Sequence, residues 1–307
     1  MKKICAVAVI IATLLLTGCY DSTELGSRAL IQALAIDYDG QYHVSAMLFS
    51  SSGSGGDTID ASQENVIHVM GEGETLSGAI DNISLIDGKR IYMSETKLLI
   101  LGGGFESANA MDALNTLYFD MRCSLNMPVC CVGSGKRAED IGSLQFTEGM
   151  TSADKLLSLI ENAHRMGVSP KTTLLDLLAD SADKKASLLP MLTVTENGIG
   201  MTLAEDSKTA VLCGSRYFDG GVLRGNFDPD KTAALMLLSG KSDKLTLNYI
   251  CGGEERTCEA YDIKITDEAY LDKSIRHVTA KFRTRGGGKL SEEERKEALN
   301  ALMKIVI

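Results

Sequence analysis

The chain has 307 residues, of which 44% are hydrophobic, and it carries a formal net charge of −10. This acidity excludes nucleic acid as a partner, because nucleic-acid binding needs clustered lysine and arginine to displace counterions. Aromatic residues make up 5% of the chain and tryptophan is missing, which argues against stacking platforms for sugars. Proteins are therefore the expected partners, and the length favours about two domains or three small ones.

The first predicted element is a leader peptide. Two lysines precede the uncharged run 4–16, which is shorter than the roughly 20 apolar residues of a membrane-spanning helix. The run closes on Leu16-Thr17-Gly18-Cys19, a pattern that resembles the bacterial lipobox, in which the cysteine thiol receives a diacylglycerol and the peptide is cut before it. We expect residues 1–18 to be this signal peptide and Cys19 to be the lipidated first residue. A secreted protein with a chance cysteine is the alternative.

A hairpin is expected next. Apolar strands over 30–36 and 42–49 surround Asp37-Tyr38-Asp39-Gly40, and Asp-Gly is a hairpin turn signal. The serine- and glycine-rich stretch 50–63 then indicates a surface loop.

The following segment alternates strands and helices. Strands are predicted over 66–70 and 97–101, and a helix is predicted over 107–121. Between the two strands, residues spaced i, i+3, i+4, i+7 predict another helix, with a buried stripe of Leu76, Ala79, Ile80 and Ile83. Together with the early hairpin, this order predicts a mixed sheet.

From Pro190 onward the pattern changes to strands punctuated by Asn-Gly and Asp-Gly turns. Ser291 and Glu294 form a capping box for a final helix. An α+β fold is therefore expected.

Six cysteines remain after Cys5 leaves with the leader and Cys19 is lipidated. They form no CxxC pair, so a zinc site is not expected. Cys130 and Cys131 lie in an apolar strand and are interpreted as small buried side chains. Cys251 and Cys258 flank Gly-Gly-Glu-Glu-Arg-Thr between two strand-like segments, and a disulfide across a hairpin and two free thiols are both open there.

No catalytic, cofactor or metal site is predicted. The glycines 102–104 follow a strand, but the G-x-G-x-x-G spacing of dinucleotide-binding proteins is missing, so a close-packed turn is the better interpretation. Glu72 and Glu74 alternate in an extended stretch, and acids before a helix are explained by its dipole. His68 lies within an alternating strand and is interpreted as structural.

Several segments together resemble the Ger(x)C family, the C-subunit lipoproteins of spore germinant receptors. The similarity covers roughly residues 14–285 and is specific by the order of its parts. Tyr20 stands where the family usually has tryptophan. The segments that carry it are LLLTGCYDSTEL, ALAIDYDGQYHVSAML, GEGETLSGAIDNIS with RIYMSETKLLILGG, YFDMRCSLNMPVCCVGSGKRAEDI, and AVLCGSRYFDGGVLRGNF.

The resemblance implies three small mixed α/β domains over 19–190, 191–255 and 256–307, with mostly antiparallel or mixed sheets. Family members usually extend beyond the position of Ile307, so the third domain is expected to be cut short. It also implies a chain without enzymatic activity or cofactor, held by Cys19 on the outer face of the inner spore membrane beside the integral-membrane A and B subunits. A solute-binding lipoprotein of a membrane transporter is the alternative.

Overall fold

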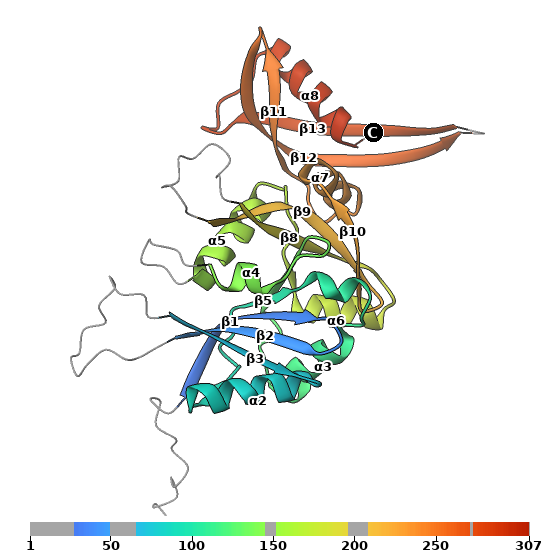
Figure 1. Ribbon diagram of the computed structural model, residues 1–307. Coiled ribbons are helices and arrows are strands. Elements are labelled where there is room, and N and C mark those ends of the chain that lie inside the picture. Colours follow the sequence, from blue (N-terminus) through green and yellow to red (C-terminus); the bar gives the residue numbers. More distant parts are fainter. Residues whose placement is uncertain (1–27, 50–65, 145–151, 196–207, 271–272, 307) are drawn as a thin grey trace, which may run out of the picture.

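The computed structural model describes residues 28–49, 66–144, 152–195, 208–270 and 273–306. Within them the chain has an α+β fold with two separate sheets (Figure 1). One sheet is mixed and has ten strands, and the other is antiparallel and has three strands. The fold class predicted from the sequence is confirmed.

The ten-stranded sheet follows the order β10-β9-β8-β6-β5-β1-β2-β3, with β4 beside β1 and β7 beside β6. Its strands are β1 (Arg28–Tyr38), β2 (Tyr42–Phe49), β3 (Val66–Gly73), β4 (Arg90–Tyr92), β5 (Leu98–Leu101), β6 (Pro128–Val132), β7 (Thr172–Thr173), β8 (Ser187–Thr195), β9 (Thr209–Asp219) and β10 (Val222–Phe227). The helices packed on it are α2 (Leu76–Asp87), the 3-10 helix η2 (Gly103–Glu106), α3 (Met111–Phe119), α4 (Glu139–Gly142), α5 (Ser152–Arg165) and α6 (Leu174–Ala182).

The predicted hairpin is confirmed as β1 and β2, which pair in antiparallel register from Leu30 opposite Phe49 to Tyr38 opposite Tyr42. Gly40 has a φ of 118°, which explains why the turn needs glycine. Strands β4, β5 and β6 add parallel pairs, so the sheet is mixed as expected.

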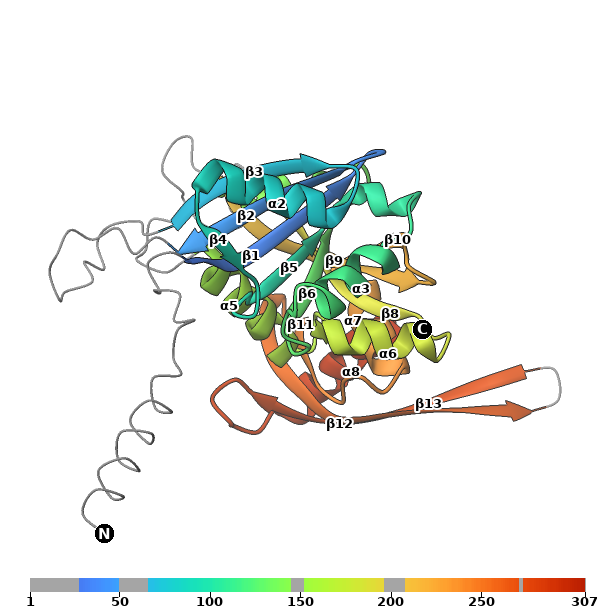
Figure 2. The ribbon, with the colours of Figure 1, turned by 90° about the horizontal axis from the view of Figure 1, so that it is seen from below.

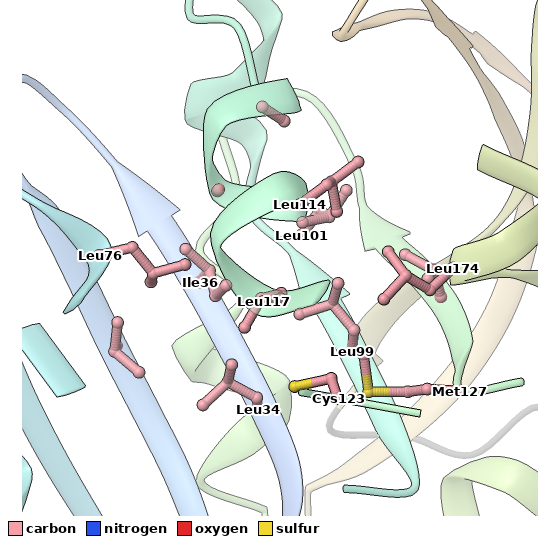
Figure 3. Close-up of a cluster of buried hydrophobic side chains, with 14 of the residues drawn as sticks. Leu34, Ile36, Leu76, Leu99, Leu101, Leu114, Leu117, Cys123, Met127 and Leu174 are labelled. Atoms are coloured by element: carbon pink, nitrogen blue, oxygen red, sulfur yellow. The ribbon is translucent and has the colours of Figure 1, made fainter. Parts of the chain in front are cut away.

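Helices cover both faces of this sheet. Helices α2, α3 and α6 pack on one face, which Figure 2 shows toward the viewer, while α4 and α5 pack on the other. Figure 3 shows side chains of β1 meeting α3 in the first of these cores, with Leu34 and Ile36 beside Leu117. Neighbouring residues of β6 serve both cores, since Cys131 lies in the first and Cys130 in the second.

The predicted stripe of α2 is buried as expected. Its four residues are each at most 3% exposed, and they are Leu76, Ala79, Ile80 and Ile83. Thr75 caps the helix by accepting a hydrogen bond from the N–H of Gly78. The helix predicted over 107–121 is shorter, because η2 forms the approach to it and α3 begins at Met111.

The second sheet has the order β11-β12-β13, with β11 (Leu245–Cys251), β12 (Glu254–Tyr270) and β13 (Lys273–Thr284). Helix α7 (Pro229–Leu238) leads into it and α8 (Glu292–Val306) packs on it (Figure 1). The predicted capping box of α8 is confirmed, because the Glu294 N–H donates to Ser291 Oγ and the Ser291 N–H donates to the Glu294 carboxylate.

The predicted domain boundaries at residues 190 and 255 lie inside the strands β8 and β12. Strand β8 continues through Pro190. Proline has no N–H to donate, but β8 pairs with β6 only from Met191 onward, so the β6–β8 ladder loses no hydrogen bond. The division into three domains stays a prediction.

Cys251 and Cys258, the candidate disulfide, are both free thiols in the structure. The register of β11 and β12 explains why the two thiols do not form a disulfide. Cys251 lies opposite Glu254 at the turn, whereas Cys258 lies opposite Leu247. The two cysteines are therefore four residues apart along the strands, about 13 Å, beyond the reach of a disulfide.

No helix in the described part of the chain is long and apolar enough to cross a membrane.

Candidate functional site

The carboxyl ends of three neighbouring parallel strands, β1, β5 and β6, meet at one edge of the ten-stranded sheet. This edge is where open α/β sheets commonly bind ligands. Asp37 lies near the end of β1 at this edge, the glycines 102–104 follow β5, and Gly133 with Ser134 follows β6.

Asp37 is buried at this edge, with 7% of its surface exposed. Its Oδ1 accepts a hydrogen bond from the Ala138 N–H at 2.8 Å, and its Oδ2 accepts one from the Glu139 N–H at 3.1 Å. Those N–H groups belong to the start of α4, where the backbone has no partner of its own. Burial raises the pKa of Asp37, and the two backbone hydrogen bonds oppose that rise. The carboxylate therefore takes the place that a bound anion has at other helix starts.

At each of the glycines 102–104, a side chain would clash with a neighbouring segment of the chain. A Cβ on Gly102 would lie 1.8 Å from Oδ1 of Asp37, although the φ of Gly102, −73°, suits any residue. A Cβ on Gly104 would lie 1.8 Å from the carbonyl oxygen of Tyr38. The N–H of Gly103 donates to the carbonyl of Lys136 at 2.9 Å. The interpretation as a close-packed turn is confirmed.

Arg216 of β9 forms a second polar connection beside this turn. Its side chain is 3% exposed, and its Nη1 lies 2.8 Å from Oε1 of Glu106 in η2. The Nε group donates to the Gly225 carbonyl at 2.9 Å. Ser134, which follows β6, donates from Oγ to Oε2 of Glu106 at 2.9 Å. One buried ion pair thus joins the β9–β10 hairpin to the ends of β5 and β6.

The chemistry of this edge is structural. Asp37 accepts hydrogen bonds from the backbone, and Arg216 donates one to the backbone and forms an ion pair with Glu106. Among the described residues, no group of three or more His, Cys, Asp or Glu is placed to hold a metal ion. The edge therefore has the location at which open α/β sheets bind ligands, and its charged side chains bond to the fold itself.

A histidine flanked by two carboxylates lies at the tip of the β1–β2 hairpin. The Nε2 atom of His43 is 3.0 Å from Oδ1 of Asp39, and its Nδ1 is 3.2 Å from Oε1 of Glu72. Burial lowers the pKa of His43, but the hydrogen bonds to both carboxylates outweigh it and raise the pKa overall. The hydrogen bond from His43 lowers the pKa of Asp39.

Sequence reasoning missed this cluster and the Arg216 pair. The signal for the first was the placement of His43 four residues after Asp39, across a hairpin turn. Glu72 was considered only together with Glu74, whereas the structure pairs it with His43.

The structure also gives the places of the other sequence-predicted residues that it describes. Cys19 and the signal peptide lie outside the described residues. Cys130 and Cys131 are fully buried, as expected, and burial raises the pKa of both thiols. His68 is half-buried within β3.

Comparison with known proteins gives the family. Residues 21–194 match the family model described as the spore germination protein N-terminal domain, which is more than half of the chain. The chain therefore belongs to this family of spore germination proteins, and within it to the Ger(x)C type, the C subunits of germinant receptors.

One similar solved structure is the crystal structure of the GerBC protein, with a TM-score of 0.47 and 15% sequence identity. The similarity covers 89% of this chain and 79% of that one. No curated protein matches the chain.

Proposed function

We propose that the chain is the lipid-anchored C subunit of a nutrient germinant receptor and that it acts in receptor assembly or signal relay without catalysing a reaction. The observation that carries this proposal is the family match, which begins at residue 21, two residues after Cys19. A lipobox directly before a germination domain fits a receptor subunit that works at a membrane surface.

Cys19 supplies the membrane attachment in this proposal. Signal peptidase removes residues 1–18, and the thiol of Cys19 carries the diacylglycerol. Two acyl chains hold a protein stably at a bilayer, whereas one chain gives only marginal and reversible binding. The body then lies on the outer face of the inner spore membrane.

The charged side chains at the polar edge bond to the chain's own backbone and to one another, which supports a role without catalysis. Asp37 is held by the amides of Ala138 and Glu139, and Arg216 is held by Glu106. Groups that are bonded in this way to their own fold are not presented to a substrate. The role we propose instead is contact with proteins, the integral-membrane A and B subunits, with which the chain would detect amino acids, sugars or nucleosides.

Labelling tests the anchor. Cells grown with labelled palmitate should label the wild-type chain and should not label Cys19→Ala. A label that survives this substitution contradicts the assignment of Cys19.

Deletion tests the receptor role. Spores without the chain should fail to germinate in response to a nutrient and should contain less of the two membrane subunits. A normal nutrient response contradicts the proposal. A strong thermal stabilisation of the purified chain by one small nutrient would favour a solute-binding lipoprotein instead.

A further inference from the structure

We infer that the body docks directly onto the bilayer through one defined surface, an inference that rests on the proposed anchor at Cys19. The surface lies at the amino ends of the parallel strands, opposite the polar edge. We call it the amino-edge surface and define it by Leu85, Lys89, Arg90, Tyr92, Phe119, Arg122 and Leu175.

Three large apolar side chains from three helices are exposed on this surface. They are Leu85 of α2 at 81%, Phe119 of α3 at 70% and Leu175 of α6 at 46%. All three helices belong to the layer that faces the viewer in Figure 2. Scattered exposed leucines are ordinary in soluble proteins. These three instead share one layer and one end of the sheet.

Strand register and helix direction place them at that end. Tyr92 of β4 lies opposite Leu30 near the start of β1, and Leu85 precedes β4 by a short turn. Leu117 lies beside Leu34 in Figure 3, and α3 ends two residues later at Phe119.

Helix α6 begins at the same end. The N–H of Leu175 donates to the carbonyl of Leu125, in the connection from α3 to β6. Strand β7, just before α6, pairs with the first residues of β6, Pro128 and Val129.

The tether brings this end of the body to the membrane. β1 begins at Arg28, nine residues after Cys19. Nine residues span at most about 30 Å when fully extended. A lipid on Cys19 therefore holds the start of β1, and the surface around it, close to the bilayer.

The charge of the surface suits anionic headgroups. Lys89, Arg90 and Arg122 lie on it within a chain whose formal net charge is −10. None of the three forms an ion pair with another residue in the described ranges. Asp120 and Asp176 are exposed beside Phe119 and Leu175, so the three cations outnumber these two carboxylates by one. Leucine and phenylalanine beside cations are typical of interfacial membrane contacts.

The lack of tryptophan allows a direct test. Phe119→Trp puts one fluorophore on the amino-edge surface. Ile250→Trp is the matched control, because Ile250 is also an exposed apolar residue, at 68%, but lies in β11 of the second sheet. The full lipidated chain is reconstituted in phosphatidylglycerol vesicles with brominated acyl chains, which quench indole on contact, and vesicle flotation is measured in parallel.

We expect both variants to float with the vesicles. The fluorescence of F119W should fall about two-fold, as for a side chain at interfacial depth, and that of I250W should not change. Flotation without quenching of F119W, or equal quenching of both variants, overturns the docking surface and leaves the anchor intact. A wild-type chain that fails to float overturns the anchor itself.

Discussion

The buried ion pair between Arg216 and Glu106 predicts a strong energetic coupling between two distant segments. Glu106→Gln keeps an acceptor for the Ser134 hydroxyl but leaves the guanidinium of Arg216 buried without its counter-charge. Breaking a buried pair in this way costs about 3–5 kcal/mol, and the partial exposure of Glu106 places the cost near 3 kcal/mol. For a unit of this size, roughly 2 °C is lost per kcal/mol, so the melting temperature should fall by about 6 °C.

A double-mutant cycle isolates this coupling. Arg216→Met removes the buried charge, after which Glu106→Gln should cost less than about 0.5 kcal/mol. Unfolding in urea followed by circular dichroism gives the four free energies of unfolding. Glu161→Gln is the control, because its pair with Lys171 is exposed and should contribute less than about 1 kcal/mol. If Glu106→Gln costs the same with and without Arg216, the two side chains are not coupled.

Three further predictions concern a glycine, a histidine and a thiol. Gly104→Ala should lower the free energy of unfolding by about 1–3 kcal/mol, because its Cβ meets the Tyr38 carbonyl, whereas Gly133→Ala, with no contact under 3.9 Å, should not lower it. Because the pKa of His43 is raised in the folded protein, its contribution to stability is full below the unfolded-state pKa near 6.5 and is lost as pH rises through the folded pKa. The loss of unfolding free energy caused by His43→Ala should therefore shrink between pH 5.5 and pH 8. A loss that stays constant over this range would contradict the prediction. Burial raises the pKa of Cys123 to about 12, so alkylation at pH 8 should require unfolding, and rapid labelling of the native thiol would count against its burial.

The parts of the fold that could be predicted depend on local sequence. The stripe of α2 and the capping box of Ser291 with Glu294 are set within a few residues of one another, so periodicity and capping chemistry found them. The first hairpin was found for the same reason, since Gly40 marks its turn.

The parts that could not be predicted depend on long-range placement. Arg216 meets Glu106 only because β9 and the end of β5 belong to the same sheet, and neither residue has a local signal for the other. Cys251 and Cys258 are kept apart by the register of β11 and β12, which composition does not define. Strand β8 runs through Pro190 and pairs with β6 from Met191 onward, a placement that no local signal in the sequence defines.

The most direct test of the account is nutrient germination by spores that lack the chain and are complemented with either the wild type or Cys19→Ala. We expect the wild type to restore germination and Cys19→Ala, made in equal amount, to leave it absent. Full germination with Cys19→Ala would contradict it, because a receptor subunit that works equally well without its lipid has no need of the anchor from which its position at the membrane was inferred.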